Sequence, residues 1–390
     1  MTAARYDIRG LRLAVDAEDD FLLGAIDDLV AQFAVGANGT TSEFSLAMRY
    51  GLLAPIVSPP PTMRQFWSGE LAGGPRMTYF TSPAGRLVDM PGIGRLRIDL
   101  VNRSADLVVS PTGEKDRPAQ LSALSDGCIV PLLCEFLAAI NAFVMHAACL
   151  AMGTVPFSGS MEKGTVPLVC LATRGTVPIS ANDGGNGDSP SGRGNQDSPP
   201  AILLTGASGR GKTTASLALA HSGMAFLTDD VTIICDNPPG DQGRPLTAWG
   251  LARPCKVLDN TFRMLPWLAE YRTTHRRRSG EQAIDVAAQI QPLAAGAAGA
   301  ARPDRVRPRA IFFLDPPNPQ GHRITPLDKV AAIALMMREN LRAVETAASG
   351  STARAFGTFT RLVAQCDTYL LSAGPRMDEL AGAIDGALGD

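Results

Sequence analysis

The segment that most constrains the fold of this chain is Gly206–Thr213, which reads GASGRGKT. It fits the pattern G-x-x-x-x-G-K-[ST], in which glycines allow a tight turn and successive backbone N–H groups point at phosphate oxygens. A short apolar strand is predicted before it, at Ala201–Thr205, and a helix after it, at Thr214–His221. Because a helix N-terminus attracts an anion, this order predicts an α/β fold with a P-loop nucleotide-binding core.

The residue types of this segment fit a nucleoside triphosphate with a metal ion. Lys212 is predicted to place a positive charge on the β- and γ-phosphates, and Thr213 to offer its hydroxyl to Mg²⁺. The sequence therefore predicts ATP and Mg²⁺ as cofactors. The residues predicted to bind the nucleotide are Gly206, Ala207, Ser208, Gly209, Arg210, Gly211, Lys212, Thr213 and Thr214.

Two adjacent carboxylates, Asp229 and Asp230, follow this segment and directly precede a strand predicted at Val231–Cys235. At this spacing they are expected to lie beside the P-loop and to face the triphosphate. One carboxylate can then hold the metal while the other accepts a proton from the attacking hydroxyl. The spacing also leaves open a solvated Asp-Asp turn with no role in chemistry.

The segment from residue 203 to 234 resembles the nucleotide-binding segment of the HPr kinase/phosphorylase family and its related serine kinases. It has their G-x-S-G-x-G-K-[ST] loop, a short helix ending near Gly223, and a paired aspartate. The resemblance implies a fold akin to phosphoenolpyruvate carboxykinase, with a core like the C-terminal domain of HPr kinase. It also implies Asp229 as the catalytic base toward the acceptor serine, beside Lys212, and Asp230 with Thr213 as metal ligands.

The resemblance extends to residues 129–150, where it implies a catalytic histidine, His146, on a strand that forms a hairpin with the P-loop strand. His146 precedes Gly206 by 60 residues. Residues 153–199 contain Gly-Thr-Val-Pro three times, followed by a Gly/Ser-rich tract that is typical of a flexible loop. We therefore predict a long, mostly disordered insert within the hairpin. An incidental buried histidine is the alternative for His146.

Together these features predict an ATP-dependent kinase that transfers the γ-phosphate to a serine or threonine hydroxyl of a protein or peptide. The family's later signature, a Glu-Arg-Gly run followed by glycines, is not found in this chain, which favours a serine on some other protein over HPr. Two alternatives stay open. One is a kinase for a small-molecule hydroxyl, and the other is a nucleotide-binding switch module without transfer activity.

Composition narrows the class of protein further. A formal net charge of −2 gives no reason to expect a nucleic-acid partner.

Seven scattered cysteines without a C-x-x-C pair, and no signal-peptide pattern, predict a cytoplasmic protein with reduced thiols. The apolar stretch Ile129–Leu150 contains Glu135 and Asn141, so it is predicted as a buried helix running into a strand rather than a membrane span. A homo-oligomer stays open.

Two regions are predicted along the chain. Residues 1–120 form an N-terminal α/β region of unknown role, and residues 121–390 form a P-loop kinase-like domain that the insert at 153–199 interrupts. The smaller predictions are helices at Phe21–Phe33, Leu327–Leu341, Met377–Leu388 and around Glu281–Gln291, strands at Arg95–Val101, Asp106–Val109 and Ala310–Leu314, and a basic patch at Arg272–Ser279.

The insert gives the first testable prediction. A Gly-Ser bridge that replaces residues 155–198 should leave the melting temperature and nucleotide binding nearly unchanged, because the entropy cost of a loop grows only logarithmically with its length. Thermal unfolding and nucleotide titration of the shortened chain measure this. A large fall in melting temperature would mean that the segment is packed structure, and the hairpin interpretation of His146 would lose its basis.

Overall fold

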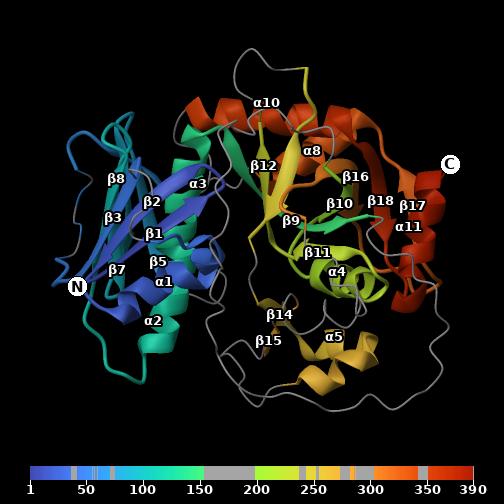
Figure 1. Ribbon diagram of the computed structural model, residues 1–390, viewed down its shortest axis with the longest axis horizontal. Helices are drawn as coiled ribbons and strands as arrows, with labels where there is room; N and C mark the ends of the chain where they lie inside the picture. Colours follow the sequence, from blue (N-terminus) through green and yellow to red (C-terminus); the bar gives the residue numbers. More distant parts are fainter. Residues whose placement is uncertain are drawn as a thin grey trace, which may run out of the picture.

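The computed structural model describes residues 1–36, 42–54, 56, 58, 60–70, 75–152, 198–236, 243–251, 254–272, 282–284, 286, 303–340 and 350–389. In this part of the chain, helices pack on two large sheets that each mix parallel and antiparallel strands (Figure 1). The predicted α/β class is therefore confirmed. Nearly all of the predicted insert and most of the basic patch lie outside the described residues.

The first sheet is built from the N-terminal part of the chain and has the strand order β1-β2-β3-β8-β7-β6-β5-β4. Buried and more exposed side chains alternate along β2 and β7, as expected for a sheet with one packed face. The helix predicted at Phe21–Phe33 is confirmed as α1 with the short η1. The strands predicted at Arg95–Val101 and Asp106–Val109 are confirmed as β7 and β8. The elements are β1 (Thr2–Ile8), β2 (Leu11–Ala17), α1 (Asp20–Val30), η1 (Ala31–Phe33), β3 (Phe44–Tyr50), β4 (Arg64–Glu70), β5 (Arg76–Thr81), β6 (Gly85–Met90), β7 (Gly94–Asp99) and β8 (Ser104–Val109).

A helical run connects the two sheets and consists of α2 (Arg117–Leu124), η2 (Ser125–Ile129) and α3 (Val130–Ala139). By length and composition, Arg117–Ala139 could cross a membrane, but 67% of its most apolar window is buried inside the protein. Figure 1 shows α3 between the two sheets, and β9 (Ala142–Ala151) follows it directly. The predicted buried helix running into a strand is confirmed.

The second sheet carries the Gly206–Thr213 segment and has the strand order β13-β12-β9-β10-β16-β18-β17, with β11 paired to β9. Strands β10, β16 and β18 are parallel, whereas β9 is antiparallel to its neighbours. The strands are β10 (Pro200–Thr205), β11 (Ala225–Thr228), β12 (Val231–Cys235), β13 (Thr247–Gly250), β16 (Arg307–Leu314), β17 (Arg323–Pro326) and β18 (Asp367–Ser372). The strands predicted at 201–205, 231–235 and 310–314 are thus confirmed.

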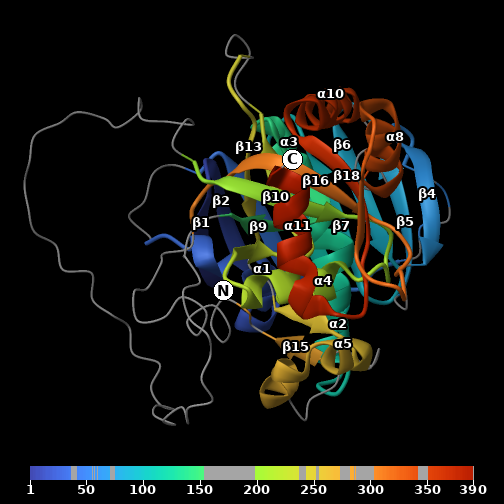
Figure 2. The same cartoon turned by 90° about the vertical axis from the view of Figure 1, so that its right-hand side faces the viewer.

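Helices cover both faces of the second sheet. One apolar core contains side chains of α4 (Lys212–His221) and α11 (Leu380–Gly389), and another contains those of α8 (Lys329–Asn340) and α10 (Gly350–Gln365). The helices of each pair contact one another (Figure 2). The helices predicted at 214–221, 327–341 and 377–388 are confirmed, the last as η5 (Met377–Glu379) followed by α11.

The helix predicted around residues 281–291 is wrong at its start. Gln282–Ile284 is strand β15, which pairs antiparallel with β14 (Cys255–Val257). Gln282 and Ile284 are both buried, which fits the period of two that a strand has. Val286 is helical, and the other residues of the predicted range lie outside the described residues. The short helix α5 (Asp259–Met264) and the turn η3 (Pro266–Tyr271) follow β14.

The two sheets share apolar packing. Val231 and Trp249 of the second sheet belong to the same buried cluster as α1, α3 and the packed face of the first sheet. A buried ion pair reinforces this junction: Arg86 Nε of β6 donates to Glu135 Oε1 of α3 at 2.8 Å. The same guanidinium donates to the carbonyl of Ser82 at 2.6 Å, so its charge is solvated by the protein. The first sheet is therefore fixed to the helix that leads into β9.

This ion pair gives a prediction about stability. Arg86→Met should lower the free energy of unfolding by about 3–5 kcal/mol, because it leaves the Glu135 carboxylate buried without its partner. The double variant Arg86→Met/Glu135→Leu should recover part of this loss. Denaturant unfolding measures both. The control is Arg376→Met, whose ion pair with Glu379 is exposed and should be worth less than about 1 kcal/mol. Equal effects of Arg86→Met and Arg376→Met would contradict the prediction.

Candidate active site

Strand β9 brings distant parts of the chain together at one point. It pairs with β10 on one edge, Ala147 opposite Thr205, and with β12 on the other, His146 opposite Val231. The predicted hairpin between the strand of His146 and the strand before the Gly206–Thr213 loop is confirmed, since Met152 N donates to Pro200 O at 2.8 Å. His146, the loop and the two aspartates therefore lie around the same end of β10.

The Gly206–Thr213 loop has the backbone conformation that its glycines permit. Gly206, Gly209 and Gly211 have φ angles of 151°, 80° and 89°, which other residues rarely adopt. A Cβ at Gly206 would also lie 3.0 Å from the carbonyl oxygen of Leu314, at the end of β16. Helix α4 begins at Lys212, directly after Gly211, so the unsatisfied N–H groups of its first turn adjoin the loop. Such a helix start can hold an anion.

The side chains at the start of α4 point in different directions. Lys212 is buried, and its Nζ donates to the carbonyl of Gly206 at 2.6 Å and to that of Ala207 at 3.4 Å. The Thr213 hydroxyl donates to Asp229 Oδ2 at 3.0 Å. Thr214 is buried and its hydroxyl is hydrogen-bonded to Thr261 of α5 at 2.9 Å. The hydroxyl of Thr213, but not that of Thr214, is therefore directed at Asp229 and Asp230, which we call the acidic pair.

Asp229 is almost fully buried, with 6% of its surface exposed. Burial, and then the charge of Asp230, raise the pKa of its carboxyl to about 6, although hydrogen bonds from Thr213 and from the thiol of Cys255 act in the opposite direction. This carboxyl therefore changes its charge near neutral pH. A cation bound beside it would favour the carboxylate form.

Asp230 faces another partner. Its Oδ1 lies 2.8 Å from His146 Nδ1, and the two side chains are 41% and 30% exposed. The backbone between the strands is fixed, because the Thr228 hydroxyl accepts from the N–H groups of Asp230 and Val231 at 3.3 and 3.2 Å. The structure thus separates the two aspartates, one buried against Thr213 and the other partly exposed against His146. Because Asp229 is buried, the two aspartates do not form the solvated Asp-Asp turn that the spacing left open.

Sequence reasoning missed several residues that hold this arrangement. Asn340 at the end of α8 accepts from His146 N at 2.7 Å, the Thr205 hydroxyl donates to His146 O at 3.1 Å, and Cys255 of β14 contacts Asp229. None of these residues stands in a recognisable motif. Thr205 adjoins the loop in sequence and could have been noticed, whereas Asn340 and Cys255 reach the site only through the fold.

Few protein groups are available for a metal ion. Among the described residues, no group of three or more His, Cys, Asp and Glu side chains could hold one. The oxygen donors beside the loop are the Thr213 hydroxyl and the carboxylates of Asp229 and Asp230. Mg²⁺ is commonly held by one or two carboxylates together with substrate phosphates and water, so this set fits a metal that arrives with a phosphate group.

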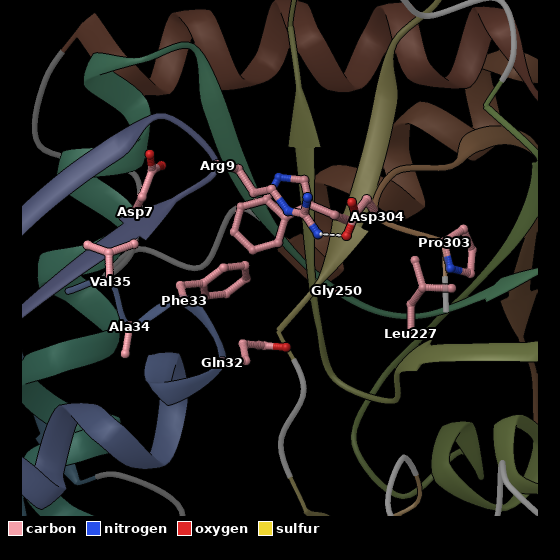
Figure 3. A pocket seen from close by; sticks show the side chains of 11 residues that line it. Asp7, Arg9, Gln32, Phe33, Ala34, Val35, Leu227, Gly250, Pro303 and Asp304 are labelled. Atoms are coloured by element: carbon pink, nitrogen blue, oxygen red, sulfur yellow. Dashed lines mark hydrogen bonds and ion pairs between the residues drawn. The ribbon is translucent and has the colours of Figure 1, made fainter. Parts of the chain in front are cut away.

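A separate cavity of about 420 Å³ lies at the junction of the two sheets (Figure 3). Arg9, at the turn between β1 and β2, reaches across it to Asp304 at 2.6 Å. Its lining residues are Asp7, Arg9, Gln32, Phe33, Ala34, Val35, Leu227, Trp249, Gly250, Pro303 and Asp304. No residue of the Gly206–Thr213 loop lines this cavity, and neither do Asp229, Asp230 or His146, so it is a separate site.

Comparison with protein-family models and with curated proteins found no match. The resemblance of residues 203–234 to the HPr kinase/phosphorylase family therefore stays a prediction.

The position of Asp229 gives a prediction about pH. Its pKa in the folded state, about 6, exceeds the ordinary value of 3.8, so the folded state binds more protons between these values. The free energy of unfolding should therefore fall as the pH rises through this window, and stay low above it. Asp229→Asn should remove this fall. Asp230→Asn should reduce it, because the charge of Asp230 is one cause of the raised pKa.

Denaturant unfolding of the three proteins between pH 4 and pH 7 tests this prediction. The relevant quantity is the difference between wild type and variant at each pH. A difference between wild type and Asp229→Asn that stays constant across the window would show that the Asp229 carboxyl does not titrate there.

Proposed function

We propose that this protein binds ATP with Mg²⁺ at the Gly206–Thr213 loop and transfers the γ-phosphate to a serine or threonine hydroxyl of a protein or peptide. The observation that carries the proposal is the 3.0 Å hydrogen bond between Thr213 and Asp229. It joins the first turn of the helix behind a glycine loop to a carboxylate, which is where a metal bound to phosphates needs oxygen ligands.

The loop supports triphosphate binding. Its glycines have the positive φ angles that allow successive backbone N–H groups to face an anion, and α4 adds the positive end of its dipole. Lys212 Nζ donates to two loop carbonyls, which are neutral acceptors. Phosphate oxygens carry negative charge and make stronger hydrogen bonds with an ammonium group. We therefore expect Lys212 to move from these carbonyls to the β- and γ-phosphates when ATP binds.

The geometry favours exchanging the roles that the sequence suggested for the two aspartates. Asp229 was expected to be the base, but it bonds Thr213, the expected Mg²⁺ ligand, and it is nearly inaccessible. Asp230 was expected to hold the metal, but it is partly exposed and paired with His146. We propose that Asp229 and Thr213 hold Mg²⁺, and that Asp230, oriented by His146, accepts the proton of the acceptor hydroxyl.

In this reaction the acceptor oxygen forms a bond with the γ-phosphorus while the bond from that phosphorus to the bridging oxygen of ADP breaks. The hydroxyl proton passes to the Asp230 carboxylate, and the products are a phosphate ester and ADP. Lys212 and the loop amides neutralise charge on the phosphates. His146, hydrogen-bonded through Nδ1, keeps the Asp230 carboxylate turned toward the exposed side of the site.

Two alternatives use the same groups. A small-molecule hydroxyl could replace the peptide serine, since neither the loop nor the acidic pair selects the acceptor. A nucleotide-binding switch would need the loop and the metal ligands but no base. The partly exposed carboxylate of Asp230, held by a histidine, favours transfer over the switch, because it could accept the proton of an acceptor hydroxyl.

The first test concerns nucleotide binding. Lys212→Ala should weaken ATP-Mg²⁺ binding by roughly 10- to 100-fold, as expected for the loss of a charge-assisted hydrogen bond. Calorimetric titration of the full chain measures it. Lys115→Ala serves as the control, because Lys115 is exposed in the connection before α2. Equal ATP affinity in wild type, Lys212→Ala and Lys115→Ala would refute the site.

The second test separates the two aspartates. Asp229→Asn should raise the Mg²⁺ concentration needed for activity, because an amide is a poorer ligand for this cation. Asp230→Asn should keep ATP and Mg²⁺ binding but lower the transfer rate by about 10²–10⁴-fold, the usual contribution of a general base. The measurement is transfer of labelled phosphate to serine peptides and to small alcohols at several Mg²⁺ concentrations.

The reverse pattern would restore Asp229 as the base and Asp230 as the metal ligand. Transfer to small alcohols alone would favour the small-molecule kinase. ATP binding without any transfer by the wild-type chain would favour the switch module.

A further inference from the structure

We propose that Asn340, at the end of α8, is a positioning residue that holds His146 in place relative to the Gly206–Thr213 loop. Asn340 is buried, and its side-chain oxygen accepts a hydrogen bond from the backbone N–H of His146. The inference rests on the proposed function, in which His146 orients the base. It adds a residue from a distant helix to the site.

The hydrogen-bond pattern of β9 explains why this position needs a side chain. Ala147 N donates to Asp230 O at 3.1 Å, toward the edge shared with β12. Backbone N–H groups alternate between the two edges of a strand, so His146 N faces the edge shared with β10. Strand β10 ends at Thr205, opposite Ala147, because the chain turns into the loop at Gly206. No strand residue is left to pair with His146 N.

Asn340 supplies the missing acceptor. Its Oδ1 accepts from His146 N at 2.7 Å, and its Nδ2 donates to the carbonyl of Met336 at 3.1 Å, one turn earlier in α8. The second bond fixes which end of the amide faces His146. An unpaired N–H at this depth would cost about 1–3 kcal/mol, so a side chain that accepts from it is strongly favoured.

Asn340 also joins His146 to the start of the loop. The Thr205 hydroxyl donates to His146 O at 3.1 Å, and Asn340 Nδ2 lies 3.5 Å from the same hydroxyl oxygen. Both backbone polar groups of His146 are thus held, one by Asn340 and one by the residue that precedes Gly206. Because the imidazole is carried by this backbone, its distance to Asp230 and to the loop depends on the two bonds.

The experiment compares three variants of the full chain. Asn340→Ala removes the acceptor for His146 N. Asn340→Asp keeps a carboxyl oxygen at the same place, whether or not it is ionised. Thr358→Val is the control: it removes another partly buried hydrogen bond, from Thr358 of α10 to Asp236, the residue after β12, at 2.8 Å.

Two readouts are measured for each variant. One is the two-bond ¹H–¹⁵N spectrum of the histidine rings; the chain has four histidines, and His146→Gln assigns the signals of His146. The other is phosphate transfer together with ATP-Mg²⁺ affinity. The ring spectrum needs no nucleotide, so it tests the role of Asn340 even if the wild-type chain transfers no phosphate. The absence of transfer would count against the proposed function and not against the role of Asn340.

We expect Asn340→Ala to shift the His146 ring signals. It should also lower the transfer rate by about 10- to 100-fold while ATP affinity stays within about threefold, since a small displacement of a reacting group costs rate more than binding. Asn340→Asp should restore most of the rate. Thr358→Val should lose comparable stability and leave the His146 signals unchanged.

The proposal is overturned if Asn340→Ala behaves like Thr358→Val, with lower stability but unaltered His146 ring signals. It is also overturned if Asn340→Asp fails to restore the rate while the protein remains folded. Should Asn340→Ala not fold, Thr205→Val tests the same link, because it removes the hydroxyl that bonds His146 O. Unchanged His146 signals in that variant would equally refute it.

Discussion

Strand β9 is hydrogen-bonded to β10 along one edge and to β12 along the other. The rest of the site depends on where β10 ends and where β12 begins beside it. On one edge β10 stops at Thr205, where the glycine loop begins, and on the other β12 starts at Val231, directly after the acidic pair. His146 lies between these two ends. A shift of β9 by one residue would turn His146 to the opposite face of the sheet and remove it from Asp230. The register of one strand therefore brings the loop, the two aspartates and His146 together.

The position of β9 is in turn coupled to the first sheet. Helix α3 runs directly into β9, and its Glu135 is buried against Arg86 of β6. The apolar cluster around α3 continues to Trp249 on the second sheet. The N-terminal sheet therefore stabilises the position of the strand that carries His146. This gives the N-terminal region a structural role that its sequence did not suggest.

The two aspartates show how an adjacent pair can acquire different chemistry. Asp229 is enclosed by Thr213 and Cys255, and burial raises its pKa, whereas Asp230 keeps contact with solvent and with His146. Their environments differ because the chain turns between β11 and β12, so that neighbouring side chains leave in different directions. Two carboxylates in different surroundings can divide metal binding and proton transfer between them.

The sequence by itself determined the local parts of this protein. The glycine loop, its flanking strand and helix, and the hairpin around residues 153–197 could be predicted because turn geometry, apolar periodicity and chain spacing are local properties. The strand at Gln282–Ile284 was missed, since a strand of three residues is too short a signal. Only the tertiary structure decided which aspartate accepts the hydrogen bond of Thr213. It also decided that Asn340 accepts from the backbone N–H of His146, which β10 does not reach. Those contacts join residues up to 194 positions apart, and a sequence does not record which groups remain unpaired when a strand ends.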